Sequence, residues 1–495
     1  MKENKRILIL FAAIIVFLFL QLPYLTAISK VWVDEPWYGG TAYNFSQGRG
    51  FTNENVVGMY GGDVIFGYPL LLGSFMKLFG GSLFTARLFS VICGVLLLLI
   101  VYFILKELKV SAVGTASFYA LFVLSSTVYI AFRTVRPESV KIIFSSLSLL
   151  FLLKGINKNN LYFILSGSLI TFAALCHPDE TMFAVAMGIL LAAISFKRRK
   201  PAPFLLFAAG VAFTGLLFLL FLYLVKDMTL YDFYLYYGRR LSVYEGTLLG
   251  NLILKAKNLI SEYALGLKRI YVLLFETLIF LCGILFLRKN KNGIILSLLG
   301  GAFFFFSLVF LERIVSRGFI SIILYSSILF SLMIDSSGAK TKPRKLLVFV
   351  GAAYILNNLA AVGYVIYRDR DNTSYSVVES FIDENVKDGK VVLSHINYYF
   401  PLKNNILYND YTIYKLTPKG DLDSIFSADE IDYAVLSSSA ISKETGTSGR
   451  KEKKESVEDF ERFYYRALRY AEEKLTIIDS LKTKGYGTIY IYEKK

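Results

Sequence analysis

Long apolar runs are the feature that most limits what this chain can fold into. Runs of mostly apolar residues recur through its first three quarters, and a helix of about 20 such residues crosses the hydrocarbon core of a bilayer. We predict an all-α polytopic membrane protein with about 11 transmembrane helices. The predicted spans are 7–28, 83–105, 111–131, 139–153, 161–176, 181–196, 203–225, 269–287, 293–311, 318–334 and 346–366. Two more polar stretches, 37–47 and 65–79, are predicted to be helices along the membrane surface.

The composition excludes most soluble classes of protein. Of the 495 residues, 55% are hydrophobic and only 19% are charged, below the charged share of about 25% in ordinary soluble domains. The three cysteines lie in apolar runs and are assigned to packing. The sequence contains no G-x-x-x-x-G-K-[ST] phosphate loop, no G-x-S-x-G elbow and no H-E-x-x-H zinc motif. Carboxylates are therefore the main candidates for acid–base chemistry, and arginine and lysine for phosphate binding.

The basic residues predict the direction of the chain. They concentrate in every second loop, which by the positive-inside rule places those loops and the N-terminus in the cytoplasm. The formal net charge of +16 is thus a topology signal, and no nucleic-acid partner is expected because no single basic face gathers this charge. We predict a multi-pass protein of the cytoplasmic membrane with its C-terminus outside.

Three pieces of the chain are predicted to lie outside. Loops 29–82 and 226–268 belong to a membrane domain over residues 1–367, and the polar tail 368–495 is predicted to be a small extracytoplasmic α/β domain. Its single histidine, His395, is assigned a surface or packing role rather than a catalytic one. Within the tail, the pattern predicts helices at Val377–Asn385 and Val457–Lys484, strands at Lys390–Ser394, Asp432–Leu436 and Thr488–Tyr492, and a flexible loop at Ser438–Glu455.

Charged residues gather at the predicted outer ends of the spans, where an idle buried charge is costly. The simple interpretation is that they are ordinary helix-end charges. It explains Asp34-Glu35 poorly, because this acidic pair lies between a span and the aromatic segment Pro36-Trp37-Tyr38. An active site on this chain is therefore predicted to face outward. The other outer charges include Asp63, Arg133, Arg136, Glu138, Lys141, His177, Asp179, Glu180, Arg239, Arg240 and Arg317.

Several short motifs follow one another in a set order along residues 1–335. Asp34-Glu35 follows the first span, Tyr68-Pro69-Leu70 opens the second surface helix, and Ala86-Arg87-Leu88 opens the second span. Arg136-Pro137-Glu138 and His177-Pro178 follow the third and fifth spans. In order, spacing and common outward face, the set resembles the GT-C glycosyltransferases, in the branch of protein O-mannosyltransferases and bacterial aminoarabinose transferases.

The resemblance implies an inverting transfer of a sugar from a polyprenyl-phosphate carrier to an acceptor hydroxyl on the outer face of the membrane. Asp34 matches the acidic residue of the family's first loop, its proposed catalytic base, and Glu138 matches the second acidic position. Arg136 or Lys141 is then expected to contact the carrier phosphate. Asp63 lies near a position where some relatives hold a metal ligand, so a divalent cation stays open as a cofactor. The acceptor, whether protein, lipid or glycan, also stays open.

Chemical reasoning supports the same assignments. A sugar phosphate already carries a good leaving group, so one carboxylate must take the acceptor proton and fixed cations must stabilise the leaving phosphate. We assign Asp34 as the base, with Glu35 and Glu138 in supporting or acceptor-orienting roles. His177 is assigned to sugar hydroxyls, with helix-end packing as its alternative. Phosphate roles are assigned to Arg136, Arg239, Arg240 and Arg317.

Alternatives remain for the function and for one motif. A flippase or transporter of lipid-linked glycans predicts polar residues along the helix middles, whereas the spans here are largely apolar in their middles. A non-catalytic membrane assembly protein is the other functional alternative. Arg239-Arg240 follow a tyrosine-rich segment, and the alternative to phosphate binding is an amphipathic segment at the membrane interface.

Overall fold

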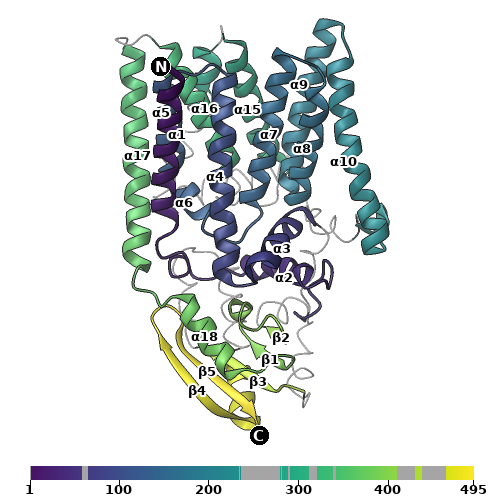
Figure 1. Cartoon of the computed structure of the whole chain (residues 1–495), viewed down its shortest axis with the longest axis vertical. Helices are drawn as coiled ribbons and strands as arrows, with labels where there is room; N and C mark the ends of the chain where they lie inside the picture. Colours follow the sequence, from purple (N-terminus) through teal and green to yellow (C-terminus); the bar gives the residue numbers. More distant parts are fainter. Residues whose placement is uncertain are drawn as a thin grey trace. The chain divides into compact units, whose positions relative to one another are not determined.

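The computed structural model describes residues 2–57, 65–233, 235, 279, 281–287, 290–310, 320–337, 342–409, 430–437 and 464–495. The chain forms two compact units that alternate along the sequence. Unit 1 comprises Met1–Pro23, Ser90–Arg133 and Pro137–Tyr364, and unit 2 comprises Tyr24–Phe89, Thr134–Arg136 and Val365–Lys495. The described part of unit 1 is helical, whereas that of unit 2 combines helices with a sheet (Figure 1).

Unit 1 is a set of packed apolar helices. Helices α7 to α10 stand side by side in Figure 1, and α8 packs against both α7 and α10. The contact of α8 with α10 is close, since a Cβ on Gly167 would overlap the Phe207 carbonyl oxygen. The helices, some of which continue beyond the unit, are α1 (Lys2–Gln21), α4 (Leu83–Glu107), α5 (Ala112–Val123), α6 (Ser126–Ala131), α7 (Glu138–Asn157), α8 (Tyr162–Cys176), α9 (Thr181–Arg198), α10 (Ala202–Lys226), α11 (Leu230–Phe233), α15 (Lys291–Phe310), α16 (Ile320–Ser336) and α17 (Lys342–Asp369).

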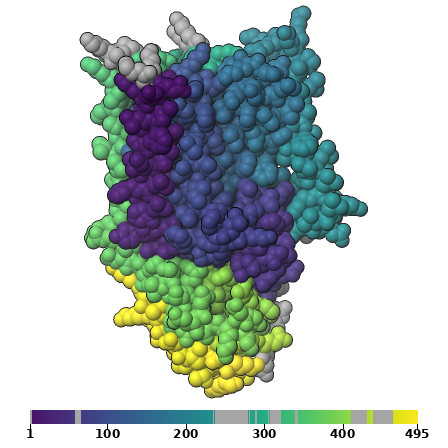
Figure 2. Space-filling model, viewed as in Figure 1, coloured from purple at the N-terminus to yellow at the C-terminus, as the bar shows by residue number. Residues whose placement is uncertain are grey.

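Five of the described helices are long and apolar enough to cross a membrane, by length and composition: α4, α7, α9 with the turn before it, α10 and α17. Helices α5, α8, α15 and α16 are shorter but also apolar. Helix α10 (teal) forms an outer edge of unit 1 in Figure 2, and Phe213, Leu216 and Leu220 on it are exposed. Exposed apolar surface of this extent fits contact with lipid. The prediction of a polytopic helical membrane protein is confirmed, and the number of eleven spans stays a prediction.

Most of the predicted spans coincide with observed helices, but span 111–131 is interrupted. Helix α5 ends at Val123 and α6 begins at Ser126. Asn358 of α17 accepts hydrogen bonds at Oδ1 from the backbone N–H and the hydroxyl of Ser126, both at 2.8 Å. These bonds satisfy donors that the break in the helix exposes. The predicted span 269–287 lies mostly outside the described residues.

Arg133, one of the predicted outer charges, closes the end of α1. Its side chain is fully buried and donates through Nη1 to the Leu20 carbonyl oxygen at 3.0 Å and through Nη2 to the Pro23 carbonyl oxygen at 2.8 Å. The last carbonyls of a helix have no partner within it, and a cation there is favoured by the helix dipole. Arg133 therefore fits the simple interpretation of a helix-end charge.

The helices predicted at 37–47 and 65–79 are observed in unit 2 as α2 (Asp34–Ser46) and α3 (Gly67–Phe79), and their place along the membrane surface stays a prediction. They pack against each other at Gly73, where a Cβ would meet the Ala42 carbonyl oxygen at 2.5 Å and Phe45 Cδ1 at 2.8 Å. Only a residue without a side chain lets the two backbones approach this closely. Because α2 begins with Asp34, this contact also supports the helix that carries the predicted base.

We expect Gly73→Ala to destabilise unit 2 by about 1–3 kcal/mol, because the added methyl group would displace the backbone of α2. The measurement is the midpoint of thermal unfolding of the purified protein in detergent. Gly215→Ala in α10 is the matched control, since a Cβ there has nothing within 4 Å, and we expect no loss of stability from it. Equal losses from the two substitutions would contradict close packing at Gly73.

The tail forms a five-stranded mixed sheet in the order β2–β1–β3–β5–β4. Strand β1 is parallel to β2 and β3, whereas β5 is antiparallel to β3 and β4. The central strand β3 is fully buried, and its Leu436 packs in one cluster with Tyr464 and Ala467 of a helix over 464–474. The strands are β1 (Val391–Ser394), β2 (Ile406–Asn409), β3 (Tyr433–Ser437), β4 (Leu475–Thr483) and β5 (Gly487–Lys494), and α18 (Tyr375–Asn385) lies beside β4 (Figure 1).

The predictions for the tail are mostly confirmed, with one error. The helix at 377–385 and the strands at 390–394, 432–436 and 488–492 are observed as α18, β1, β3 and β5. The predicted helix Val457–Lys484 is wrong in its second half, because the helix over 464–474 is followed by strand β4. The hairpin between β4 and β5 turns at Gly485, whose φ of 112° favours glycine. The predicted loop Ser438–Glu455 lies outside the described residues.

A segment of the first loop extends the sheet of the tail. Val56 forms a parallel bridge with Leu407 of β2, and the Val57 N–H donates to the Leu407 carbonyl oxygen at 3.0 Å. The Asn55 side chain also donates to the Lys403 carbonyl oxygen at 3.0 Å. Unit 2 thus contains residues from both sides of the predicted boundary between 367 and 368. Pairing with a sheet edge fixes the backbone of a loop that has no regular structure of its own.

Glu379 on α18 gives the stability of unit 2 an expected dependence on pH. Burial raises the pKa of its carboxyl from the ordinary 4.5 to about 7, against the attraction of Lys403. The folded protein therefore holds this proton more tightly than the unfolded chain does, and the stability that the proton contributes is lost as the pH rises toward 7. We expect Glu379→Gln to remove that loss, so the unfolding midpoint of the variant should rise relative to wild type between pH 5 and 8. A constant difference over this range would contradict the expectation.

Candidate active site

The predicted base Asp34 is the first residue of α2, and its side chain is partly exposed (34%). Nη1 of Arg136 forms an ion pair with Asp34 Oδ2, and the Trp32 indole N–H donates to the same oxygen at 3.2 Å. Within the described residues, the other carboxylate oxygen of Asp34 accepts no hydrogen bond. The Asp34 carboxylate is therefore fixed at one oxygen by two donors, is partly exposed, and lies directly beside the Arg136 cation.

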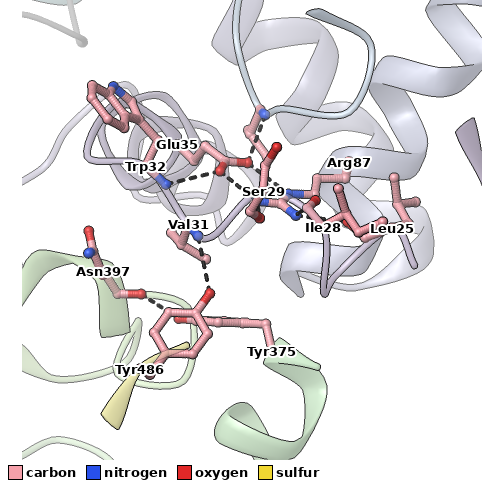
Figure 3. A network of polar contacts seen from close by, with 11 residues as sticks. Leu25, Ile28, Ser29, Val31, Trp32, Glu35, Arg87, Tyr375, Asn397 and Tyr486 are labelled. Atoms are coloured by element: carbon pink, nitrogen blue, oxygen red, sulfur yellow. Dashed lines mark hydrogen bonds and ion pairs between the residues drawn. The ribbon is translucent and has the colours of Figure 1, made fainter. Parts of the chain in front are cut away.

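Glu35, the neighbour of Asp34, is completely buried and fully hydrogen bonded (Figure 3). Arg87 donates to it through Nη2 at 2.7 Å and through Nε at 2.9 Å, one bond to each carboxylate oxygen. The backbone N–H groups of Trp32 and Val135 add bonds of 3.1 and 3.0 Å. A two-pronged arginine–carboxylate pair with this geometry is among the strongest charged contacts in proteins. Glu35 is thus bound on every side by protein groups.

Arg87 also fixes the chain that leads into α2. Its Nη1 donates to the Leu25 carbonyl oxygen at 2.8 Å, and its Nη2 donates to the Ser29 carbonyl oxygen at 3.0 Å. Figure 3 shows these backbone groups around the guanidinium, with Glu35 on its other side. One buried side chain at the start of α4 therefore ties both the segment 25–29 and α2 to the same point.

Residues of the tail hold the same segment from a second direction (Figure 3). The Val31 N–H donates to the Tyr486 hydroxyl at 3.1 Å, and the Lys30 ammonium donates to the Gly485 carbonyl oxygen. Burial raises the pKa of Tyr486 to about 12, so its hydroxyl stays neutral. The Tyr375 N–H adds a bond of 3.2 Å to the Thr26 carbonyl oxygen. The backbone directly before Asp34 is therefore fixed by the turn between β4 and β5.

A second charged cluster lies in unit 1, where α7, α16 and the short turn η1 (Pro178–Glu180) contribute residues. The Lys141 ammonium pairs with Asp179 and lies 3.6 Å from a Glu180 oxygen, and all three side chains are almost fully buried. The His177 ring nitrogen Nδ1 is 2.5 Å from Asp179, and the Ser321 hydroxyl donates to Glu180 at 3.0 Å. Buried charges persist when they are paired and hydrogen bonded in this way.

Comparison with known proteins identifies the class of enzyme to which the chain belongs. Residues 66–224 match the model of a family described as dolichyl-phosphate-mannose-protein mannosyltransferase. The fold is similar to the crystal structure of ArnT from Cupriavidus metallidurans bound to undecaprenyl phosphate, with a TM-score of 0.60, 12% identity, and coverage of 98% of this chain and 97% of that one. The chain is a membrane glycosyltransferase of the GT-C type.

Other comparisons agree with this class. The same ArnT in its apo state gives a TM-score of 0.59 at 12% identity, again over 98% of this chain and 97% of that one. The arabinofuranosyltransferase AftD from Mycobacteria gives 0.54 at 10% identity, over 100% of this chain and 40% of that one. No curated protein matches the chain in sequence. At these identities the solved structures show the fold of the glycosyltransferase, and its site has to be argued from its own residues.

The structure of the glycosyltransferase brings the predicted site residues into two groups. Asp34, Glu35 and Arg136 meet in unit 2, and Lys141 and His177 meet in unit 1. Glu138 is buried in the first turn of α7, where a negative charge favours the helix dipole. Asp63, Arg239, Arg240 and Arg317 lie outside the described residues. Among the residues that are described, no group of three or more His, Cys, Asp or Glu side chains is arranged to hold a metal ion.

Several residues of the glycosyltransferase stand out in the sequence, but their sequence positions assign them no role. Arg87 was part of the motif that opens the second span, and a charged residue in the first turn of a span is by itself a signal of a buried partner. Asp179 and Glu180 belong to the charges at the predicted outer ends of the spans. Trp32 and Tyr486 carried no signal, because nothing in the sequence shows that they contact the segment around Asp34.

Proposed function

We propose that this glycosyltransferase moves a sugar from a polyprenyl-phosphate carrier to an acceptor hydroxyl at the outer face of the cytoplasmic membrane, with inversion at the anomeric carbon. Support for the carrier comes from two of the comparisons. The description of the matched family names dolichyl-phosphate-mannose, and the ArnT of similar fold was solved with undecaprenyl phosphate bound. The concentration of basic residues in alternate loops supports the outward orientation.

The observation that carries the proposal is the pairing of Asp34 with Arg136. In the proposed step the acceptor oxygen attacks the anomeric carbon, and the bond from that carbon to the phosphate oxygen breaks. Asp34 takes the proton of the acceptor hydroxyl as the new bond forms. The phosphate leaves with the electron pair, and Arg136, the cation paired with Asp34, is proposed to stabilise its charge. One carboxylate oxygen and one guanidinium thus provide both functions that the step needs.

The remaining residues receive supporting roles in this proposal. Glu35 positions α2 through Arg87, because its buried carboxylate has no oxygen left for a substrate. Glu138 stays the proposed second acidic residue. Lys141 and His177 are proposed to act at the donor through their shared cluster, of which the His177 side chain is the most exposed member (26%). Phosphate roles for Arg239, Arg240 and Arg317 and a cation at Asp63 stay proposals.

A turnover assay tests the function directly. The purified protein in lipid nanodiscs is incubated with a panel of polyprenyl-phosphate sugars, with and without divalent cations, and free polyprenyl phosphate is quantified. We expect release from at least one donor and none from the same donors in empty nanodiscs. Absence of release from every donor, with an extract added as a source of acceptor, would contradict the proposal. Movement of intact donor between leaflets without cleavage would instead indicate the transporter alternative.

A further inference from the structure

Trp32 lies two residues before Asp34 and is tied to both acidic residues that follow it. Its indole N–H donates to Asp34 Oδ2 at 3.2 Å, and its backbone N–H donates to Glu35 Oε1 at 3.1 Å. Despite these two bonds, 44% of the residue is exposed. Tryptophan combines a large rigid apolar ring with a single polar group, the indole N–H, and here this N–H is bonded to Asp34. The indole is therefore held beside the carboxylate with part of its surface accessible.

We propose that Trp32 positions Asp34 for proton transfer and that its exposed ring is the surface on which an acceptor sugar packs. This inference rests on the proposed function, and it narrows the acceptor to a carbohydrate. Neither role was visible in the sequence, where Trp32 belongs to no motif. The inference follows from the hydrogen bonds of Asp34 and from the exposure of the indole.

The hydrogen bonds of Asp34 support the positioning role. Arg136 and Trp32 both donate to Oδ2, so that oxygen is engaged by two donors. Within the described residues Oδ1 accepts none, and it is the oxygen on which the acceptor proton arrives. Among the described residues, loss of the indole N–H leaves Arg136 as the one donor that fixes the rotation of the carboxylate. A base must lie within hydrogen-bond reach of its proton, so a less fixed carboxylate slows the step.

The position of the ring supports the acceptor sugar. The hydroxyl that loses its proton must come within about 3 Å of Asp34, so the rest of the acceptor lies next to the group bonded to Asp34. A sugar ring has an apolar face of C–H groups and a rim of hydroxyls. That pattern complements an exposed aromatic face with a carboxylate at its edge. A serine or threonine side chain in a polypeptide has no comparable face to pack there.

Substitution of Trp32 separates the two roles kinetically. Trp32→Phe keeps an aromatic face but removes the N–H, and we expect kcat to fall on the order of tenfold with little change in the acceptor KM. Trp32→Ala removes both the aromatic face and the N–H. In addition to the fall in kcat, we expect the acceptor KM to rise on the order of tenfold while the donor KM stays unchanged. Tyr465→Ala, at an exposed aromatic of the same unit, is the matched control and should change neither. An unchanged kcat in Trp32→Phe would overturn the positioning role, and a changed donor KM would overturn the acceptor assignment.

Fluorescence tests the binding surface without turnover. The chain has two tryptophans, so Trp37→Phe leaves Trp32 as the only reporter. Methyl mannoside, N-acetylglucosamine and an arabinose oligomer are titrated into this protein in nanodiscs, in parallel with a peptide rich in serine and threonine. We expect a saturable change in emission with at least one saccharide and none with the peptide.

The outcomes keep the inference and the proposed function apart. Saccharide binding without turnover on any donor would remove the proposed function and leave Trp32 as a carbohydrate-binding residue. Turnover with no response to any saccharide, or a response to the peptide alone, would overturn the carbohydrate acceptor and keep the transferase. Emission that responds only to the lipid composition of the nanodisc would show an interface anchor and overturn the binding role.

Discussion

Asp34→Asn should lower sugar transfer by about 10²- to 10⁴-fold, the usual contribution of a positioned general base. The amide keeps the size of the side chain and still accepts from Arg136 and Trp32, so the fold around it is retained. It is far less basic than a carboxylate and takes no proton from the acceptor. The measurement is the rate of polyprenyl-phosphate release by wild type and variant, each normalised to the amount of folded protein.

Glu54→Gln provides the matched control for this experiment. Glu54 is an exposed acidic residue on the same loop and in the same unit as Asp34. Its substitution therefore removes one negative charge from the loop without changing Asp34. We expect its removal to leave the rate within a factor of two or so of wild type, as for ordinary surface substitutions. Transfer by Asp34→Asn at a rate near that of wild type would remove Asp34 from the role of base, whatever the other residues do.

Arg87→Met should destabilise unit 2 by about 3–5 kcal/mol, because it leaves the Glu35 carboxylate buried without its cation. The same substitution removes the donors to the carbonyl groups of Leu25 and Ser29. We expect a large fall in the midpoint of thermal unfolding in detergent. Protease resistance of the segment before α2 should be lost together with it. Arg469→Met, at an exposed pair with Glu473 in the same unit, should cost less than about 1 kcal/mol.

A second variant separates the charge from the packing. Glu35→Gln combined with Arg87→Met removes both charges while the amide oxygen still accepts a backbone hydrogen bond. We expect this double variant to be more stable than Arg87→Met alone, since an uncompensated buried charge is the main cost. If the double variant is the less stable of the two, the buried charge is not what Arg87 neutralises, and its hydrogen bonds to the backbone carry the effect.

The acidic pair shows what a sequence can and cannot reveal about this site. Asp34 and Glu35 both follow the first predicted span directly, and this position makes both of them candidates for the active site. It does not show which of the two is buried. Consecutive residues of a helix point about 100° apart, so one carboxylate faces the interior and the other faces outward. Only the structure shows that Glu35 is the buried member, with Arg87 as its partner 52 residues away. The sequence also makes Asp34 and Arg136 candidates for the active site. It does not predict that these two residues, 102 positions apart, form an ion pair.

The strands of the tail show a different limit. Strand β3 is short, apolar and buried on both faces, and such a run reads clearly as a strand. Strand β4 carries Ile477, Ile478 and Leu481 at spacings that also fit one face of a helix, so the sequence alone does not mark the end of the helix before it. Most of its side chains are exposed, so burial imposes no alternation on it. Its pairing with β5 decided the outcome, and that pairing depends on the turn at Gly485.

The bond between Val31 and Tyr486 has a consequence for how the protein is made. Its two residues are 455 positions apart in the chain. At a synthesis rate of about 5–20 residues per second, roughly 20–90 s pass between the emergence of the first and of the second from the ribosome. The helices between them are synthesised during that interval. The segment that carries Asp34 therefore reaches its final form late, and a polypeptide released early lacks the contacts that fix it.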